Sequence, residues 1–301
     1  MTITPSLLHQ AAADAAGAQH FPAGALYVLA TPIGNLADLS LRAIHLLSRV
    51  DAVACEDTRV TGRLLHHLGL DKPLIALHEH NELSAAQAVI ARLASGQRVA
   101  YASDAGTPAI SDPGAALVAA VVAHGLVVMP IPGASSVVTA LSVAGDAAAQ
   151  GFVFHGFLPP KGQERRDALG ALLALPGSQV LFEAPHRIEA LLALLAELAP
   201  QRRLTLCREL TKQFEQIHTL LAADAPAWLA ADAQHARGEF VLVLHAAPAA
   251  AVAEGLPPET ERVLVLLLRE LPLKQAVALA AEISGAPRNA LYSRALALRD
   301  A

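Results

Sequence analysis

Between residues 26 and 145, the chain alternates short apolar runs of strand type with segments whose apolar residues recur at helical spacing. This alternation is typical of a mostly parallel sheet with helices packed on its faces. The first series predicts strands at residues 26–30, 52–55, 74–77, 98–102 and 126–129. A second series, from residue 152 to residue 245, has an order of strands and helices that suits a mixed or antiparallel sheet. The predicted fold class is therefore α/β, with two α/β domains.

Four segments follow from this pattern. We predict a parallel-sheet N-terminal α/β domain at residues 25–147 and a mixed-sheet second α/β domain at residues 148–247. A stretch rich in Ala, Pro and Gly then indicates a linker. Residues 259–301 are expected to form a small helical domain, in which two helices joined by Gly285-Ala-Pro287 resemble a helix-turn-helix. Residues 1–24 are expected to be a flexible tail.

Composition argues against several classes of protein. The longest apolar run, residues 115–129, falls short of the roughly 20 residues that cross a bilayer, and the N-terminus lacks the pattern of a secretory signal. Two distant cysteines and 13 scattered histidines argue against disulfides and a metal site. The formal net charge of -5 argues against nonspecific binding to polyanions, so any contact with nucleic acid must be local. We expect a cytoplasmic protein.

The loop at residues 103–114, with the sequence SDAGTPAISDPG, is the strongest candidate for a ligand site. It follows a predicted parallel strand, and open parallel sheets bind ligands beyond the carboxyl ends of their strands. Its glycines and prolines force tight turns while its polar groups remain available to a ligand. The simpler interpretation is an ordinary surface turn. Two other turns, TPIGN after the first strand and PGASS after the fifth, are expected at the same edge.

Nucleotide fingerprints are absent from the sequence. No GxG occurs, which excludes the dinucleotide pattern GxGxxG, and GxxxxGK[ST] does not occur either. NAD and ATP are therefore poor candidates for the ligand of the loop.

Charged clusters follow several predicted strands, at CEDTR, HEHNE, EAPHR and RELTK. Active-site residues gather at such positions, although any single cluster can be a solvated turn. His78, His80 and Glu82 lack a third metal ligand at suitable spacing, so no metal is predicted.

These motifs, together with GFLPPKGQERR and GEFVLVL and in this order, resemble the bacterial ribosomal RNA small subunit methyltransferase I family of the tetrapyrrole methylase superfamily. The resemblance runs from about Leu26 to the C-terminus. It implies S-adenosylmethionine-dependent 2′-O-methylation of the ribose of a decoding-region cytidine in 16S ribosomal RNA. It also implies S-adenosylhomocysteine as the product, the small ribosomal subunit as partner, and a homodimer.

The resemblance further implies that the cofactor lies in the cleft between the two α/β domains. Carried over motif by motif, the cofactor-binding residues are Pro32, Ser103, Asp104, Ala105, Gly106, Ile110, Ser135, Ser136 and Phe182. The first loop reads TPIGN where the wider superfamily has a glycine-rich GxGxGD form, and this departure weighs against a tetrapyrrole substrate.

Methyl transfer from a sulfonium mainly requires alignment of the nucleophile, and an acceptor near the weakly acidic ribose hydroxyl would help. The catalytic candidates are Asp57, His80 and Glu82, with Glu183 in reserve.

Guanidinium groups pair well with phosphate, so the arginines near these motifs are candidates for RNA contact. The predicted RNA-binding residues are Arg59, Lys161, Arg165, Arg166, His186, Arg187, Arg288 and Arg294, with Arg202, Arg203, Arg208 and Lys212 as a further patch.

Two other functions stay open on sequence grounds. One is a methylase of the same superfamily that acts on a small tetrapyrrole. The other is a nonenzymatic regulator that binds nucleic acid through the helix-turn-helix-like segment, which would leave the loop at residues 103–114 without a purpose.

Overall fold

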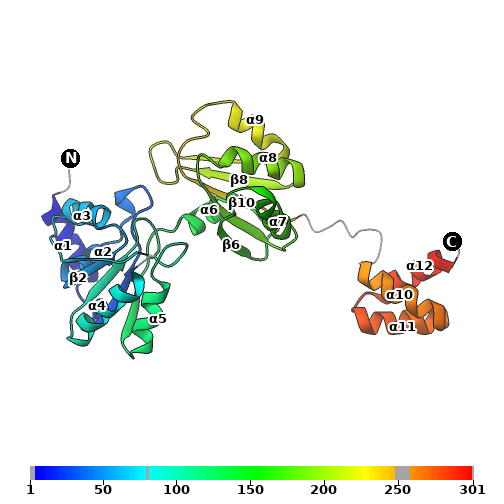
Figure 1. Cartoon of the computed structure of the whole chain (residues 1–301), viewed down its shortest axis with the longest axis horizontal. Helices are drawn as coiled ribbons and strands as arrows, with labels where there is room; N and C mark the ends of the chain where they lie inside the picture. The colour runs from blue at the N-terminus through cyan, green and yellow to red at the C-terminus, as the bar shows by residue number, and fades with distance from the viewer. Residues whose placement is uncertain (1–3, 79–80, 248–257, 300–301) are drawn as a thin grey trace. The chain divides into compact units, whose positions relative to one another are not determined.

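The first five strands form one parallel sheet (Figure 1). They are β1 (Ala25–Leu29), β2 (Ala52–Cys55), β3 (Leu74–Ala76), β4 (Val99–Ala102) and β5 (Val127–Ile131). Their order across the sheet is β3-β2-β4-β1-β5, and each neighbouring pair is parallel. Because all five strands run the same way, the loops after β1, β4 and β5 leave from the same edge.

Helices cover both faces of this sheet. Side chains alternate between the two faces along each strand, so Tyr27 and Leu29 of β1 enter one core and Leu26 enters the other. Helices α1 (Pro5–Ala16), α2 (Leu41–Arg49) and α3 (Thr58–His67) pack in the first core, and α4 (Glu82–Ala94) and α5 (Ala115–Ala123) in the second.

The N-terminal segment corrects one prediction. Residues 5–16 are not part of a flexible tail but form α1, with Pro5 in the first turn. Its alanines are good helix formers. Ala12 is fully buried in the core that α2 shares, and Leu8, four residues earlier, packs against the same core. The helix is therefore held by tertiary contact that no short-range pattern revealed.

Helix α4 begins at Glu82, and Ser84 lies in its first turn, where the Ser84 hydroxyl donates to the Asn81 carbonyl. The Glu82 side chain makes its contact outside its own helix.

The second sheet is mixed. It contains β6 (Phe152–Phe157), β7 (Ser178–Glu183), β8 (Arg203–Arg208), β9 (Gln216–Leu221) and β10 (Phe240–Leu244), in the order β6-β7-β10-β8-β9. Only the pair β6–β7 is parallel, and the other neighbours are antiparallel. The expected combination of a parallel sheet and a mixed sheet is confirmed.

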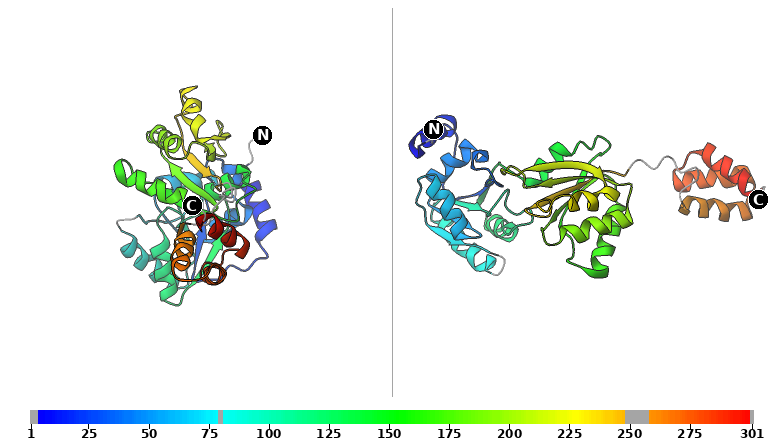
Figure 2. Two further views of the ribbon diagram at one scale, coloured as in Figure 1. Left: turned by 90° about the vertical axis from the view of Figure 1, so that its right-hand side faces the viewer. Right: turned by 90° about the horizontal axis from the view of Figure 1, so that it is seen from above.

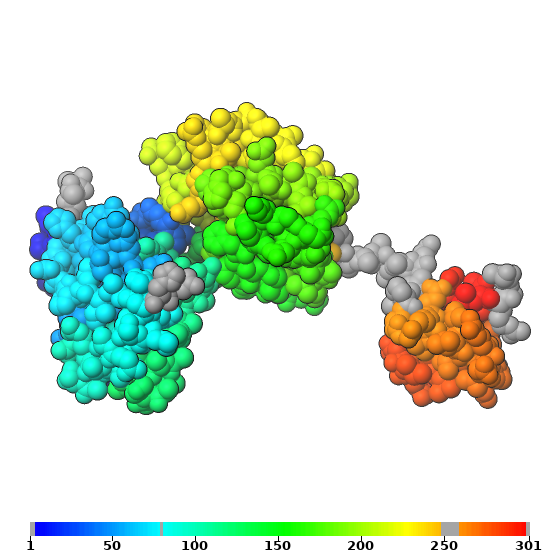
Figure 3. Space-filling view, in the orientation of Figure 1, coloured from blue at the N-terminus to red at the C-terminus, as the bar shows by residue number. Residues whose placement is uncertain are grey.

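Helices also cover both faces of the second sheet. α7 (Gly162–Leu173), α8 (Ile188–Leu198) and α9 (Ala225–Ala230) bury leucines against one face. α6 (Ser136–Ala144), which begins at the edge of the first sheet, packs Val137, Ala140 and Ala144 on the other face. The space-filling view shows this part of the chain hollowed where the two α/β halves meet (Figure 3).

The structure is a computed structural model and describes residues 4–78, 81–247 and 258–299. It divides into two compact units, residues 1–246 and 247–301. The second contains α10 (Pro258–Glu270), α11 (Leu273–Ser284) and α12 (Arg288–Arg299), which pack around Leu264, Val277 and Leu291 (Figure 2). Within the described ranges, no helix is both long and apolar enough to cross a membrane.

Candidate cofactor and active site

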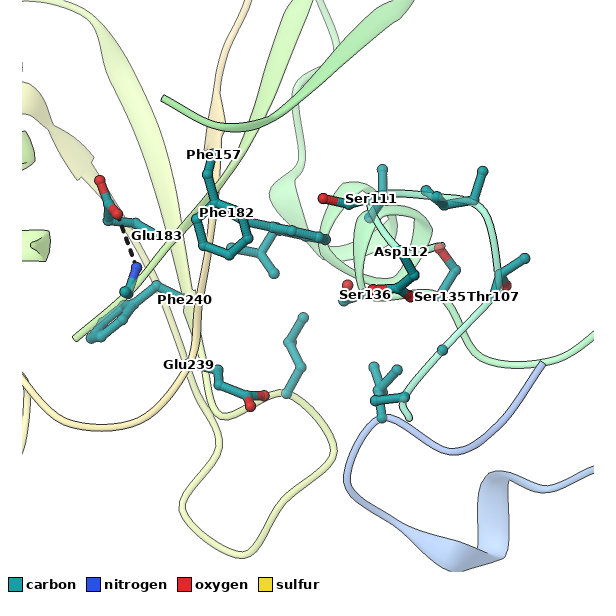
Figure 4. Close-up of a pocket in the computed structure, with 18 of the residues that line it drawn as sticks. Thr107, Ser111, Asp112, Ser135, Ser136, Phe157, Phe182, Glu183, Glu239 and Phe240 are labelled. Carbon is teal, nitrogen blue, oxygen red and sulfur yellow. Dashed lines mark hydrogen bonds between the residues drawn. The ribbon is translucent and has the colours of Figure 1, made fainter. Parts of the chain in front are cut away.

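A cavity of about 330 Å³ lies between the loops of the first sheet and the second sheet. In Figure 4, Thr107, Ser111, Asp112, Ser135 and Ser136 line one side, and Phe157, Phe182, Glu183, Glu239 and Phe240 line the other. Further lining residues are Ile33, Ala105, Gly106, Ile110, Val137, Ala184, Pro185, Leu210 and Val241. The cavity therefore combines polar groups from one domain with aromatic rings from the other.

The loop at residues 103–114 is fixed at its end by two side chains. Glu82 accepts hydrogen bonds from the Gly114 nitrogen at 2.9 Å and from two further amides at the start of α5. The buried Tyr101 hydroxyl donates to the Pro113 carbonyl at 2.5 Å. An added Cβ at Gly114 would lie 2.2 Å from the Tyr101 ring, so only glycine fits there. These contacts hold the loop against the sheet edge.

Backbone strain concentrates in two loops of the cavity. Ala109 and Ser111 have φ of 63° and 77°, and Glu209 and Thr211 have φ of 52° and 65°. Non-glycine residues in this left-handed region cost of order 1–3 kcal/mol and cluster at functional sites. Thr211 is the most unusual of the four because it is β-branched. Both loops are therefore held in conformations that the surrounding structure imposes.

The loop after β1 joins these parts together. Thr31 and Gly106 exchange backbone hydrogen bonds at 2.9 and 3.1 Å. At Gly34 an added Cβ would lie 2.4 Å from the Lys212 side chain and 3.1 Å from the Leu210 carbonyl. The absence of a side chain at Gly34 thus allows the loop of the first domain to approach the strained loop of the second.

The loop after β5 supplies the polar start of α6. Ser135 precedes the helix and Ser136 begins it, and both line the cavity. The Thr107 hydroxyl donates to the Ala134 carbonyl at 3.0 Å, which ties this loop to the loop at residues 103–114. Backbone amides at a helix start attract negative charge, so this corner suits a carboxylate.

Phenylalanines form the opposite wall. Phe182 packs edge-to-face with Phe154 and Phe157, at ring-centroid distances of 4.8 and 5.7 Å. Phe157 is 55% exposed, although it is a large apolar residue. An aromatic face that is open to a cavity suits the stacking of a flat ring.

Three carboxylates line the cavity, and their surroundings differ. Glu183 is buried, forms an ion pair with Arg165, and has Oε1 2.9 Å from Arg187 Nε. Glu239 is exposed and lies 2.9 Å from Lys212 Nζ. Asp112 has no ion pair with any residue that the structure describes, and burial raises the pKa of its carboxyl group. Asp112 is therefore the carboxylate that is available to a cationic or hydrogen-donating ligand.

Comparisons with known proteins agree with this architecture. A model of the tetrapyrrole (corrin/porphyrin) methylases matches residues 25–226, and a model of the RsmI C-terminal HTH domain matches residues 254–299. The chain belongs to the tetrapyrrole methylase family. It is an S-adenosylmethionine-dependent methyltransferase.

Two relatives carry the name ribosomal RNA small subunit methyltransferase I. The protein of Neisseria meningitidis serogroup A is 47% identical over 92% of this chain and 94% of its own length. That of Escherichia coli O157:H7 is 46% identical over 91% and 95%. Uroporphyrin-III C-methyltransferase of Thermus thermophilus, complexed with S-adenyl homocysteine, shares the fold with a TM-score of 0.51 and 16% identity, over 72% of this chain and 96% of that one.

The cavity of this methylase fits its cofactor chemically. The aromatic wall offers a stacking surface for adenine, and the start of α6 offers amide donors to the methionine carboxylate. Asp112 offers an acceptor to an ammonium or to ribose hydroxyls. A positively charged sulfonium also suits a cavity whose unpaired charge is negative.

The cavity brings together six of the nine predicted cofactor residues. These are Ala105, Gly106, Ile110, Ser135, Ser136 and Phe182. The other three, Pro32, Ser103 and Asp104, line a second cavity of about 270 Å³ between the loop after β1 and α3. Ser103 and Asp104 directly precede Ala105, so one loop borders both cavities.

The predicted catalytic residues do not gather at one point. Glu183 lines the cavity, but two arginines neutralise its charge. The Glu82 carboxylate already accepts hydrogen bonds from the backbone amides at the start of α5. Asp57 caps α3 and forms an ion pair with Arg59, which lowers the pKa of the Asp57 carboxyl to about 2. His80 lies outside the described residues.

The predicted RNA-binding residues fall into three groups. Arg165 is buried and donates to Glu183, so it does not belong to a basic surface patch, and Arg202 and Arg208 are buried too. Those that form ion pairs with neighbouring carboxylates are Arg59, Arg166, Arg187, Lys212 and Arg294. Those that are exposed and form no ion pair with the described residues are Lys161, His186, Arg203 and Arg288.

Several lining residues escaped the sequence analysis. Asp112 and Thr107 belong to the loop at residues 103–114, which the sequence predicts as a ligand site. The sequence does not show that their side chains face the cavity. Phe157, Leu210 and Phe240 lie in other strands and loops and reach the cavity only because the second sheet faces the first. No local pattern gives that relationship.

Proposed function

We propose that the chain transfers a methyl group from S-adenosylmethionine to the 2′-hydroxyl of a cytidine ribose in the decoding region of 16S ribosomal RNA. The observation that carries this proposal is the identity of 46–47% to relatives named ribosomal RNA small subunit methyltransferase I, over more than nine-tenths of the chain. The cavity of about 330 Å³ between the two sheets, with its aromatic wall and polar loops, supports it. Ribosomal RNA as substrate would place the protein in the cytoplasm.

The cofactor supplies an activated methyl group on a positively charged sulfur. The residues of the chain would hold and orient it: Phe182 would offer its ring for stacking, the amides after Ser135 would bind the carboxylate, and Asp112 would accept hydrogen bonds. Residues 103–106 form the surface against which the acceptor oxygen approaches. A bimolecular displacement gains most of its rate from such alignment.

The ribose hydroxyl must lose its proton as the new bond to carbon forms. Of the candidates, Asp57 is retained as a hydrogen-bond acceptor, because its backbone amide donates to Asp104 Oδ1 at 3.0 Å and so fixes it beside the loop. Because its pKa is lowered to about 2, Asp57 is a weak base, so it would orient the hydroxyl while the proton passes to solvent water. Glu183 instead positions the 158–160 segment, because its partner Arg187 donates to the Leu158 and Pro159 carbonyls.

We also propose that the protein acts as a homodimer. Strands β5 and β6 lie at sheet edges, and large apolar side chains are exposed on and beside them. Val127, Val138 and Phe152 are 50%, 60% and 52% exposed. Apolar edges of this kind mark association surfaces. A Phe152→Glu variant should then sediment as a monomer at concentrations where the unmodified protein is a dimer, and equal sedimentation of the two would contradict this surface.

Labelled S-adenosylmethionine tests the substrate. The protein is incubated with small ribosomal subunits that lack the modification, with naked 16S ribosomal RNA, and with uroporphyrinogen as a tetrapyrrole. We expect label in the ribosomal RNA and none in the tetrapyrrole. Label in the tetrapyrrole alone would replace the proposal with the small-molecule alternative.

A further inference from the structure

The second cavity is built to hold a ligand with one flat apolar part and one anionic part. It opens between the loop after β1 and α3. Thr31, Thr61 and Ser103 are almost fully buried and form its inner end. Arg63 and His67, one turn apart on α3, are exposed at its mouth. The apolar side chains that line it are Pro32, Leu36, Val60 and Leu64.

The same loop borders this cavity and the cofactor cavity. Ser103 and Asp104 line the second cavity, and Ala105 and Gly106 line the first. The backbone pairing of Thr31 with Gly106 fixes the boundary between them. A ligand in each cavity would therefore approach the same short segment of chain.

We propose that the second cavity receives the acceptor nucleotide of the RNA, with the ring between the apolar residues and a phosphate on Arg63. This inference rests on the proposed function and deepens it, because it says where the methyl acceptor enters. Unstacked nucleotides of single-stranded RNA can be splayed out and bound individually, and proteins hold such strands by stacking on the bases and by positive charge along the phosphates.

The charges of the cavity match the polarity of a nucleotide. Arg63 forms no ion pair with any residue that the structure describes, whereas Arg165, Arg166 and Lys212 all do. A free guanidinium at the mouth is suited to phosphate. Asp104, inside the cavity, receives the Asp57 amide on Oδ1, and its carboxylate can also accept hydrogen bonds from ribose hydroxyls or from the amino group of cytosine.

Negative charge near the cavity does not oppose this assignment. Glu56, Asp57 and Asp104 lie at the carboxyl ends of β2 and β4, next to the buried end of the cavity, and Arg59 neutralises Asp57. On the exposed face of α3, the charged or titratable side chains are Arg59, Arg63, His66 and His67. A phosphate would therefore meet the cationic side of the helix.

An Arg63→Ala variant tests the site, with Arg49→Ala as the matched control. Arg49 is an exposed arginine at the end of α2 that forms no ion pair with the described residues. The affinity for undermethylated small subunits is measured over a range of salt concentrations, and S-adenosylmethionine binding is measured by calorimetry. We expect Arg63→Ala to weaken subunit binding about tenfold and to reduce the salt slope by about one unit. S-adenosylmethionine affinity and the Arg49→Ala variant should be unchanged.

A second variant, Val60→Phe, fills the cavity without altering charge. It should slow single-turnover methyl transfer while S-adenosylmethionine binding and the melting temperature stay close to those of the unmodified protein. Equal subunit affinity and equal salt dependence for Arg63→Ala and Arg49→Ala would overturn the proposal. Loss of S-adenosylmethionine affinity in either cavity variant would overturn it as well, because it would place the cofactor there.

Failure of the proposed function would look different. In that case the unmodified protein itself would transfer no methyl group to subunits or ribosomal RNA. The inference is then tested by fluorescence anisotropy with a cytidine-containing RNA oligonucleotide. Weaker binding by Arg63→Ala than by Arg49→Ala supports a nucleotide site, and equal binding overturns it.

Discussion

Glu82 Oε1 accepts a hydrogen bond from the Gly114 nitrogen at 2.9 Å, across 32 residues of chain. The same oxygen accepts from the amides of Ala116 and Leu117 at 3.1 and 3.2 Å. The carboxylate thus caps α5 from another helix, where negative charge is favoured. This contact connects the HEHNE motif to the cofactor loop, so we assign Glu82 a positioning role in place of the predicted role as acceptor for the ribose hydroxyl.

Glu82→Ala should loosen that loop. Hydrogen bonds to a charged acceptor contribute about 1.5–3 kcal/mol, so we expect their loss to lower the free energy of unfolding and to weaken S-adenosylmethionine binding. Glu82→Gln keeps one side-chain oxygen, so its stability and its S-adenosylmethionine affinity should lie between those of Glu82→Ala and of the unmodified protein. Glu189→Gln, at an exposed position in the first turn of α8, is the control. Calorimetry and thermal melting measure both effects, and an Ala variant that binds like the unmodified protein would contradict this role.

Glu183→Gln should lower the free energy of unfolding more than a substitution that breaks an exposed ion pair. The change leaves Arg165 buried without a counter-charge, and breaking a buried ion pair costs roughly 3–5 kcal/mol. Glu197→Gln, which breaks the exposed pair with Arg166, should lower the free energy of unfolding far less, because solvent screens exposed charges. Urea unfolding measures both. Similar values for the two variants would show that the buried cluster does not hold the fold.

Asp112→Asn should separate stability from binding. Burial raises the pKa of Asp112, so the ionised form is unfavourable in the folded protein and its destabilising effect grows as pH rises through that pKa. The Asn variant should therefore melt higher at neutral pH, with the difference vanishing in acid. Its S-adenosylmethionine affinity should fall about tenfold through loss of a charged hydrogen bond. A variant with unchanged affinity would remove Asp112 from the cofactor site.

Asp57 should stay ionised into strong acid. Hydrogen bonds from Arg59 lower the pKa of Asp57 to about 2, below the ordinary aspartate value of about 3.9. The pair therefore stabilises the fold above the ordinary value, and this contribution is lost as pH falls through the folded-state pKa. Carbon-detected NMR titration should show the low value, and Arg59→Ala should return it toward the ordinary range. A normal pKa in the unmodified protein would show that the pair does not form.

Sequence patterns predicted the sheets because strand and helix periods are local properties. The strand at residues 52–55 has the predicted bounds, and the other four predicted strands of the first sheet differ from the observed ones by one or two residues at their ends. Helix α1 was missed because Ala12 is buried only by contact with residues far along the chain. Roles within the site were harder still. The sequence places Glu82, Arg165 and Glu183 in motifs, but Glu82 is 32 residues from Gly114 and Arg165 is 18 residues from Glu183. Only the folded chain shows that these charged groups already have partners.

The identity of the modified nucleoside tests the central claim most directly. Undermethylated small subunits are incubated with the protein and S-adenosylmethionine, and the 16S ribosomal RNA is digested to nucleosides for mass spectrometry. The account predicts a gain of 2′-O-methylcytidine, abolished when S-adenosylmethionine is omitted. A gain of a base-methylated nucleoside instead, or of no methylated nucleoside at all, would contradict it.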